Sequence, residues 1–326
     1  MRLAGRHAHD VEQAARLLAG GELVAFPTET VYGLGARADD DTAVAKIFAA
    51  KGRPADHPLI VHVAQADDAL AFTPAMPAMA HRLVDAFWPG PLTVIVPRRP
   101  EMAQAAAGGQ HTIALRCPAH PVALALLDAC KGLGVPGLAA PSANRFGRIS
   151  PTRADHVEAD LGEAVAVLDG GACQIGIEST IVDCSGKHTL LLRPGMLGRE
   201  RIELALGQAV LDADETAPRA PGTLAAHYAP QAKLRIMPVE MLKTALQMLG
   251  TPPLKLAVYS RSLPAGFAPG VLHQRMPLRP EAAAHELFAT LRGFDASDVQ
   301  LIWVEELPDG HEWDGVRDRL QRAAAS

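Results

Sequence analysis

Apolar positions recur along the chain with two periods, one typical of strands and one typical of helices. Short aliphatic runs that end at glycine or proline predict buried strands. Segments in which apolar residues return every three to four positions predict amphipathic helices. In the first part of the chain these patterns predict strands over 22–26, 58–63 and 112–116, and helices over 11–19, 77–87 and 121–132.

Two predicted helices carry local end signals. Asp10 is placed to cap the helix over 11–19, and the acidic residues 39–41 precede a helix that stops at Gly52 and Pro54. Short polar side chains accept hydrogen bonds from the free N–H groups of a first turn, and glycine commonly ends a helix. We expect His7 and His9 to belong to a frayed N-terminus.

Several later strands follow one another without a helix between them. The stretches "AVAVLDGG", "GIESTIVDC" and "TLLLRPG" predict three such strands, whereas helices separate the earlier ones. Hairpin-length connectors suit antiparallel neighbours, and helical crossovers suit parallel ones. We therefore predict an α/β fold with a twisted, mixed sheet covered by helices, rather than a strictly parallel doubly wound sheet.

The periodicity weakens between residues 207 and 232, which are rich in Pro, Ala and Asp, and strands and helices then alternate again. The strands are expected at "KLRIMPV", "LKLAVYS" and "VQLIWVEEL", and the helices at "EMLKTALQMLG", "PEAAAHELFATLRG" and "WDGVRDRLQRAAA". This pattern predicts a domain over 1–206, a linker over 207–232 and a smaller open α/β, Rossmann-like domain over 233–326.

Composition narrows the classes of function. A formal net charge of −5 argues against broad electrostatic binding to nucleic acid. The four cysteines form no CxxC pair, so they fit buried thiols in a reducing cytosol better than a zinc site or a disulfide scaffold. The N-terminal residues lack a signal peptide, and no apolar run reaches the length of a membrane span. We therefore expect a soluble cytoplasmic protein without a membrane partner.

The segment "FPTETVYGLGA", residues 26–36, looks like a ligand loop at the end of a strand. Its Gly33-Leu-Gly35 matches part of the dinucleotide-binding fingerprint, but that turn must lie directly between a strand and a helix. Pro27 ends the strand well before Gly33, and the next helix starts after the match. We expect the glycines to let the backbone turn away from a pocket.

Cations and hydroxyls gather near other predicted element ends. Lys51 and Arg53 either complement a helix dipole or direct a point charge and a fork at one anion. The loop over 140–152 either binds phosphate or is an ordinary loop with Ser150 or Thr152 as a helix cap. With no evident nucleophile or metal cluster, these residues suit the positioning of charged substrates, as in phosphoryl or nucleotidyl transfer.

Single polar residues in strands leave two interpretations open. Arg116 and Arg193, at strand ends, are either ligand-binding or surface cations. His62 alternates with apolar residues, which favours a half-buried histidine when it is considered alone.

Six motifs occur in one order: "FPTETVYGLGA", "KGRPADHPL", "WPGPLT", "APSANRFGRISPT", "ESTIVD" and "LLRPG". Together they resemble the YrdC/Sua5 family of L-threonylcarbamoyladenylate synthases, and the linker and C-terminal domain resemble the longer Sua5 type. The resemblance implies a YrdC-like catalytic fold and synthesis of threonylcarbamoyl-AMP and diphosphate from L-threonine, bicarbonate and ATP. The product would serve formation of N6-threonylcarbamoyladenosine at tRNA position 37, through a downstream transferase machinery.

The resemblance also implies residue roles. Lys51 and Arg53 would be catalytic and would stabilise negative charge, while Mg2+ would accompany ATP without dedicated protein ligands. Residues around L-threonine would be Thr30, His62, Arg116, Ala140, Ser179 and Thr180, with Arg116 pairing the carboxylate. The ATP site would comprise Lys51, Arg53, His57, Thr112, Ser142, Asn144, Ser150, Arg193 and, closing over it from the linker, Tyr228.

The chain departs from the family pattern at His57, where such proteins often carry asparagine, and in its less basic linker. The general base, direct tRNA binding and the role of the C-terminal domain stay open. Three alternatives are an RNA-binding module, a regulatory YrdC-like module without synthase activity, and a carbamoyl-transfer enzyme. The acidic charge weighs against the first alternative, and the absent CxxC motifs weigh against the third. The second is disfavoured by the joint presence of Lys51, Arg53, Ser142, Asn144 and Arg193.

Overall fold

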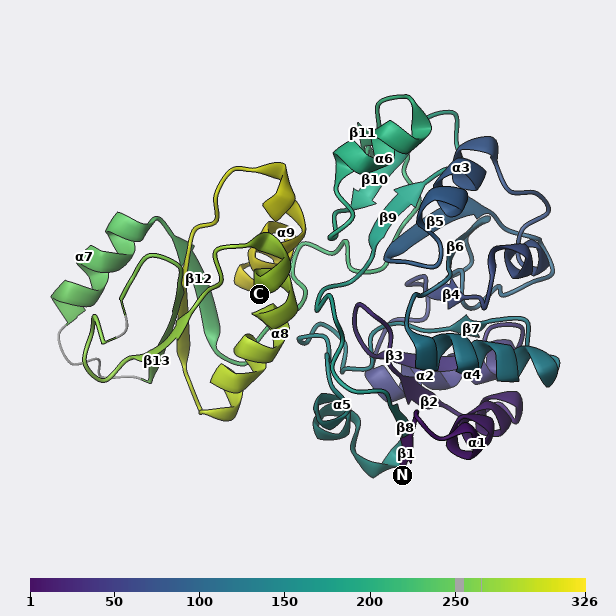
Figure 1. The fold of residues 1–326 in the computed structure, drawn as a ribbon, viewed down its shortest axis with the longest axis horizontal. Coiled ribbons are helices and arrows are strands. Elements are labelled where there is room, and N and C mark those ends of the chain that lie inside the picture. Colours follow the sequence, from purple (N-terminus) through teal and green to yellow (C-terminus); the bar gives the residue numbers. More distant parts are fainter. Residues whose placement is uncertain (250–254, 265) are drawn as a thin grey trace. The chain divides into compact units, whose positions relative to one another are not determined.

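A computed structural model describes residues 1–249, 255–264 and 266–326, and these residues divide into two compact units (Figure 1). The first unit comprises Met1–Phe146 and Ser150–Thr223, and the second comprises Gly147–Ile149 and Leu224–Ser326. The three residues 147–149 therefore belong to the second unit although the chain on both sides of them belongs to the first. The domains expected from sequence, over 1–206 and 233–326 with a linker between them, remain predictions.

The first unit is built on one mixed sheet, as predicted. Its described strands lie in the order β1-β8-β2-β3-β7-β4-β6-β5-β9-β10-β11. β2 pairs parallel with β8 but antiparallel with β3, and β5 pairs parallel with β9 but antiparallel with β6. The bounds are β1 (Arg2–Ala4), β2 (Val24–Phe26), β3 (Gly33–Arg37), β4 (Ile60–His62), β5 (Leu92–Pro97), β6 (Thr112–Arg116), β7 (Leu138–Ala139), β8 (Ala166–Asp169), β9 (Thr180–Asp183), β10 (Leu190–Arg193) and β11 (Leu211–Asp212).

Helices cover this sheet because its strands are apolar on both faces. Along β2, Val24 and Phe26 join a core with α1 and α4, whereas Ala25 faces a core that includes α2 and α3. The helices are α1 (Ala8–Ala19), α2 (Asp41–Lys51), α3 (Ala78–Phe87), α4 (Pro121–Gly132), α5 (Ala154–Leu161) and α6 (Arg199–Leu206), with short 3-10 turns η1 (Ala66–Ala71) and η2 (Gly162–Ala164).

The helix α2 follows its local signals. The Asp40 side chain accepts hydrogen bonds from the backbone N–H groups of Thr42 and Ala43, at 2.9 and 3.3 Å. Gly52 follows the helix in the left-handed conformation, with φ +63°. The prediction of both ends is confirmed, because each end depends on residues within one turn.

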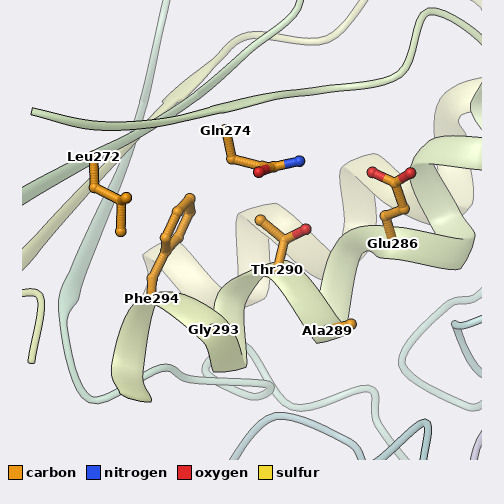
Figure 2. Close-up of a pocket in the computed structure, with 7 residues that line it drawn as sticks. All are labelled: Leu272, Gln274, Glu286, Ala289, Thr290, Gly293 and Phe294. Carbon is orange, nitrogen blue, oxygen red and sulfur yellow. The ribbon is translucent and has the colours of Figure 1, made fainter. Parts of the chain in front are cut away.

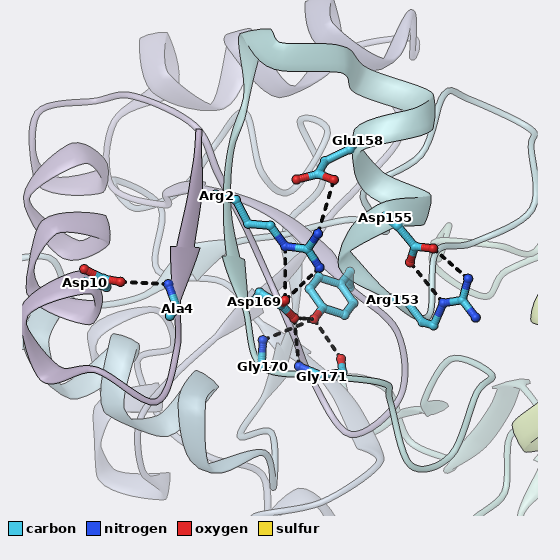
Figure 3. A network of polar contacts seen from close by, with 10 residues as sticks. Arg2, Ala4, Asp10, Arg153, Asp155, Glu158, Asp169, Gly170 and Gly171 are labelled. Carbon is cyan, nitrogen blue, oxygen red and sulfur yellow. Dashed lines mark hydrogen bonds and ion pairs between the residues drawn. The ribbon is translucent and has the colours of Figure 1, made fainter.

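The predicted frayed N-terminus is wrong, because β1 pairs with β8 and Arg2 forms an ion pair with Asp169 at 2.7 Å. Asp10 is not a helix cap either. It lies in the first turn of α1, where its carboxylate accepts from the Ala4 N–H at 2.8 Å and ties β1 to the helix (Figure 3). Both contacts join the N-terminus to other elements, so the local sequence did not reveal them.

Two further local expectations fail. Gly33 and Gly35 do not form a turn but belong to β3, and a Cβ on Gly35 would meet Phe26 Cε1 at 2.8 Å. The second glycine therefore allows the Phe26 ring to lie close to the paired strand. Neither Ser150 nor Thr152 caps a helix, because α5 begins at Ala154 with Arg153 at the cap position.

The second unit contains a parallel sheet in the order β12-β15-β13-β14. Its elements are β12 (Lys233–Met237), α7 (Val239–Leu249), β13 (Leu256–Ser260), β14 (Leu272–Arg275), α8 (Pro280–Ala296), β15 (Leu301–Glu305), η3 (His311–Trp313) and α9 (Asp314–Ala324). The open α/β prediction is confirmed, and β14 was missed. The predicted end of one helix, Gly250, and start of one strand, Leu254, lie outside the described residues. In the described part of the chain, no helix has both the length and the apolar content of a membrane span.

Candidate functional site

The loop between β2 and β3 is fixed by hydroxyl groups. Thr28 Oγ1 accepts from the N–H groups of Thr30 and Val31 at 3.1 and 3.2 Å and donates to the Val31 carbonyl at 2.7 Å. The Thr30 hydroxyl lies 2.8 Å from Thr28 Oγ1, and both side chains are buried. Thr28 therefore shapes the loop and orients the hydroxyl of Thr30.

A second chain segment holds the same loop from outside. The N–H of Ile175 donates to the Glu29 carbonyl at 2.7 Å, and the N–H of Gly176 donates to the Thr30 carbonyl at 3.1 Å. These bonds fix the backbone that directly follows the Glu29 side chain. The glutamate thus projects from a rigid position.

Arg116, at the end of β6, is a buried residue and not a surface cation. Its Nη2 lies 2.7 Å from Glu29 Oε1, and the two side chains are only 4% and 5% exposed. In the parallel pairing of β4 with β6, Arg116 lies opposite His62. The sheet therefore brings together the histidine and arginine that the resemblance assigns to L-threonine.

His62 is buried, and its ring lies perpendicular to the Phe26 ring at a centroid distance of 5.9 Å. Burial, followed by the positive charge of Arg116, lowers the pKa of His62 to about 3. The imidazole is therefore neutral near pH 7. Its Nδ1 is buried, and no atom of the described residues forms a hydrogen bond with it.

Lys51 joins two motifs that are far apart in sequence. It is the last residue of α2, and its buried Nζ donates to the Ser142 carbonyl at 2.7 Å and to the Asn144 carbonyl. The Phe146 N–H returns a hydrogen bond to the Lys51 carbonyl at 2.9 Å. Burial, followed by repulsion from Arg53, lowers the pKa of Lys51 to about 7. Burial has already removed the Lys51 ammonium group from water. An anion that binds to it therefore adds little to the desolvation cost of the lysine.

Arg53 and His57 contact the same loop. The Arg53 guanidinium lies over the Phe146 ring at 5.5 Å, and its Nη2 donates to the Pro58 carbonyl at 3.0 Å. The His57 ring meets Phe146 edge to face at 5.5 Å, and burial followed by the charge of Arg53 lowers its pKa. One aromatic side chain therefore organises two candidate ATP-binding residues.

The loop over 142–150 contains the remaining hydroxyl and amide candidates. Ser142 pairs with Gly33 in an isolated antiparallel bridge, and the Asn144 side chain donates to the Arg145 carbonyl at 2.7 Å. Ser150 is buried, and its hydroxyl donates to the Glu178 carboxylate. Glu178 was missed as a site residue, although it begins the "ESTIVD" motif.

Arg193 is buried and holds two segments together. Its Nε and Nη2 donate to the Ser179 carbonyl at 3.0 and 2.9 Å, and its Nη1 donates to the Pro221 carbonyl at 2.9 Å. The Ser179 hydroxyl lies 2.8 Å from Thr93 Oγ1. The Thr180 hydroxyl instead donates to the Leu197 carbonyl at 2.8 Å, so it is engaged away from Ser179.

Part of the predicted linker packs on the first unit. Ala220 joins an apolar cluster with Ile60, Ala114 and Ile181. Because strand residues alternate between faces, Thr112, Ala114 and Arg116 share one face of the sheet. Thr112 lines a hollow of about 510 Å³ with residues of the 183–190 and 214–218 segments. The linker thus covers part of the face on which candidate residues lie.

Ala140 and Tyr228, the last two candidate residues, lie in different parts of the fold. The N–H of Ala140 donates to the Ile60 carbonyl at 2.9 Å, which places this residue beside β4. Tyr228 belongs to the second unit, where its ring stacks on Phe288 at 5.5 Å and lies beneath Arg319 at 5.2 Å. Its contact with a nucleotide remains a prediction.

Tyr32 anchors the loop from its other end. Its hydroxyl donates to the Gly171 carbonyl at 2.8 Å and accepts from the Gly170 N–H at 3.2 Å. Asp169, 3.2 Å from the hydroxyl, also binds Arg2, as Figure 3 shows. The one sign in the sequence that Tyr32 holds the loop is an aromatic residue within "TETVYG".

A different hollow lies in the second unit, between β14 and α8 (Figure 2). It measures about 420 Å³, and no residue of the six sequence motifs lines it. Its polar groups are those of Gln274, Glu286 and Thr290. Among the described residues of both units, no group of three or more His, Cys, Asp or Glu side chains is arranged to hold a metal ion.

Comparison with known proteins covers nearly the whole chain. A family model described as "Telomere recombination" (Sua5_yciO_yrdC) matches residues 16–195, and one described as "Threonylcarbamoyl-AMP synthase, C-terminal domain" matches residues 197–325. A threonylcarbamoyl-AMP synthase of Bacillus subtilis is 40% identical over 324 residues, which is 96% of this chain and 92% of the relative. One of Pyrococcus abyssi is 37% identical over 328 residues, which is 95% of this chain and 93% of the relative.

A solved structure agrees with these matches. The crystal structure of P. abyssi Sua5 complexed with L-threonine has a TM-score of 0.89 and 35% sequence identity. The similarity covers 99% of this chain and 97% of that one. Both the order of the two units along the chain and their individual folds are therefore shared.

Proposed function

Because the chain belongs to the threonylcarbamoyl-AMP synthase family, we propose that it converts L-threonine, bicarbonate and ATP into threonylcarbamoyl-AMP and diphosphate. The observation that carries this proposal is the contact of Lys51 with the Ser142 and Asn144 carbonyls, which joins two phosphate-binding candidates in one place. The product would then supply N6-threonylcarbamoyladenosine formation at tRNA position 37, through a separate transferase.

L-Threonine would bind at the β4–β6 side of the site. A relative has been crystallised with L-threonine, and Arg116 and His62 lie opposite each other here. Arg116 would pair the carboxylate, and the neutral His62 would accept a hydrogen bond. Thr30, Ala140, Ser179 and Thr180 would complete the surroundings, with Thr180 acting through its backbone because its hydroxyl is bound to Leu197.

ATP would bind along the loop over 142–150. Lys51 and Arg53 would face its phosphates, because both are already positioned by contacts to this loop or its flanking residues. A bound polyphosphate favours the charged form of Lys51, so ATP binding would be coupled to uptake of a proton. The remaining contacts would come from His57, Thr112, Ser142, Asn144, Ser150, Arg193 and Tyr228.

In this reaction the main task of the protein is to position charged groups around the substrates. The threonine amine reacts with bicarbonate to give a carbamate and water. A carbamate oxygen then attacks the α-phosphorus of ATP, and the bond from this phosphorus to the diphosphate breaks. Negative charge grows on the phosphate oxygens, where Lys51 and Arg53 would stabilise it. Mg2+ would accompany ATP, held by the phosphates and water, where it neutralises charge.

The proposal is tested by the identity of the product. The protein is incubated with ATP, Mg2+, L-threonine and carbon-13 bicarbonate, and the nucleotides are analysed by mass spectrometry. We expect an adenylate that contains threonine and the carbon-13 atom. An adenylate without the label, or ATP left unchanged by a folded protein, would contradict the proposal.

A matched pair of lysine variants locates the activity. Lys51→Met removes the buried ammonium group, whereas Lys46→Met removes an exposed one from the same helix. We expect Lys51→Met to lower kcat/KM for ATP at least about a hundredfold, as for loss of a charge that stabilises the transition state. Lys46→Met should stay within about twofold, because surface ion pairs contribute little. Equal activity of both variants would remove Lys51 from the mechanism.

A further inference from the structure

One carboxylate oxygen of Glu29 has no hydrogen-bond partner among the described residues. Oε1 pairs with Arg116 Nη2 at 2.7 Å, and the side chain is only 5% exposed. Oε2 is buried, and none of the described residues forms a hydrogen bond with it. Burying a charged oxygen without a partner is costly, so the arrangement favours a ligand that brings a donor.

The arrangement of charge matches the common part of every α-amino acid. A guanidinium and a carboxylate lie side by side at Arg116 and Glu29, and an amino acid carries a carboxylate and an ammonium group on one carbon. The ligand carboxylate can pair with the arginine while the ligand ammonium pairs with the glutamate. One buried ion pair is then replaced by a closed set of alternating charges.

We propose that Glu29 is a catalytic residue that binds the α-ammonium group of the amino-acid substrate through Oε2 and accepts the proton that this group must lose. The inference rests on the proposed function, since it places L-threonine beside Arg116. It extends that function by naming a residue for the deprotonation step.

The position of Glu29 supports this role. It lies between the two threonines whose hydroxyls fix the loop, and its carbonyl is held by Ile175 at 2.7 Å. Its partner Arg116 lies opposite His62 in the sheet. Since His62 Nδ1 is also buried without a hydrogen-bond partner among the described residues, two unpartnered polar atoms lie on the residues that neighbour Arg116.

The other titratable groups around Glu29 are poorly suited to accept this proton. Burial lowers the pKa of His62 to about 3, and it also lowers the pKa of His120. Burial raises the pKa of the Cys117 and Cys173 thiols to about 12, so they are neutral and do not bind a cation. Glu29 contributes the carboxyl group of this cluster, with Oε1 at 2.7 Å from Arg116 Nη2.

Deprotonation of the substrate comes first, and the attack on bicarbonate follows. The N–H bond of the ammonium group breaks, its proton moves to Glu29 Oε2, and the electron pair stays on nitrogen. The free amine attacks the carbon of bicarbonate, an N–C bond forms, and hydroxide leaves as water with the second nitrogen proton. The products are the carbamate, water and protonated Glu29, which returns its proton to solvent.

The first test compares ligands on the wild-type protein by isothermal titration calorimetry. L-Threonine is compared with 3-hydroxybutanoate, which lacks the amine, and with L-threonine amide, which lacks the carboxylate. We expect both analogues to bind at least about tenfold more weakly, because each leaves one buried charge unpaired. Equal binding of 3-hydroxybutanoate and threonine would overturn the inference without any variant.

The second test uses Glu29→Gln, which keeps the size of the side chain, with the exposed Glu12→Gln as control. We expect Glu29→Gln to lose the preference for threonine over 3-hydroxybutanoate while it keeps the preference for threonine over the amide. Diphosphate release at saturating threonine should also fall at least about tenfold, and Glu29→Asp should restore part of it. Glu12→Gln should match the wild type in every assay.

The two levels of the proposal fail in different ways. If the wild type neither binds threonine nor releases diphosphate, the proposed function itself is wrong. If the wild type does both and Glu29→Gln behaves the same, only the role of Glu29 is wrong. If Glu29→Gln binds threonine normally but loses turnover, Glu29 does not hold the ammonium group and the inference is overturned in that part.

Discussion

At the scale of single residues, the sequence proposed a set of candidate side chains but did not indicate what most of them touch. Lys51 illustrates the difference. Its position at the end of a helix and before Gly-Arg-Pro left a helix-dipole role and an anion-binding role open. As the last residue of α2, it holds two carbonyls of a loop about 90 positions later. Such a contact depends on tertiary packing, so no local pattern could predict it.

The burial of Lys51 predicts a stability that depends on pH. The pKa of Lys51 is about 7 in the folded protein, against 10.5 ordinarily. Between these values the unfolded chain binds a proton that the folded chain does not, so folding becomes more favourable as pH rises through this window. Below pH 7 both states are charged and the cost of burial is fully present.

Urea unfolding of the wild type and Lys51→Met, near pH 7 and near pH 9, checks this prediction. We expect the wild type to gain stability relative to Lys51→Met, by at most about 1.4 kcal/mol per pH unit. The exposed Lys46→Met should follow the wild type at both values. Parallel curves for the wild type and Lys51→Met would show that the buried lysine stays charged on folding.

At the scale of elements, the sequence predicted best those helices and strands that depend on interactions between residues close together in the chain. The helices α2 and α4 were predicted to their ends, because caps and terminal glycines act within a turn. The strands β1 and β3 were missed, because their identity depends on pairing with β8, β2 and β7. A glycine-rich strand in particular resembles a loop when it is considered without its partners.

The role of Gly35 in β3 gives a prediction for this scale. An added Cβ would meet Phe26 Cε1 at 2.8 Å, and Phe26 is fully buried. We expect Gly35→Ala to destabilise the protein by about 1–3 kcal/mol through overpacking. Gly132→Ala, at the end of α4, meets nothing within 4 Å and should stabilise it by up to about 1 kcal/mol. Chemical unfolding of both variants measures the difference, and a neutral Gly35→Ala would mean that the ring of Phe26 moves freely.

At the scale of the whole molecule, the mixed sheet of the first unit and the open parallel sheet of the second follow from the spacing of strands and helices. The assignment of residues 147–149 to the second unit does not follow from this spacing. It depends on hydrogen bonds that the carbonyls of Gly147 and Ile149 accept from residues far along the chain. The motifs located the candidate site because each contains residues near strand ends or loops. Glu29 and Glu178 are part of these motifs, but the motifs did not reveal that they pair with Arg116 and Ser150, because the fold brings these residues together.

The most direct measurement of the proposed activity is diphosphate release by the full chain, with each substrate omitted in turn. We predict release when ATP, L-threonine and bicarbonate are all present, and a fall to background when threonine or bicarbonate is left out. Diphosphate that forms equally well without threonine, or none at all from a folded protein with every substrate present, would contradict synthesis of threonylcarbamoyl-AMP.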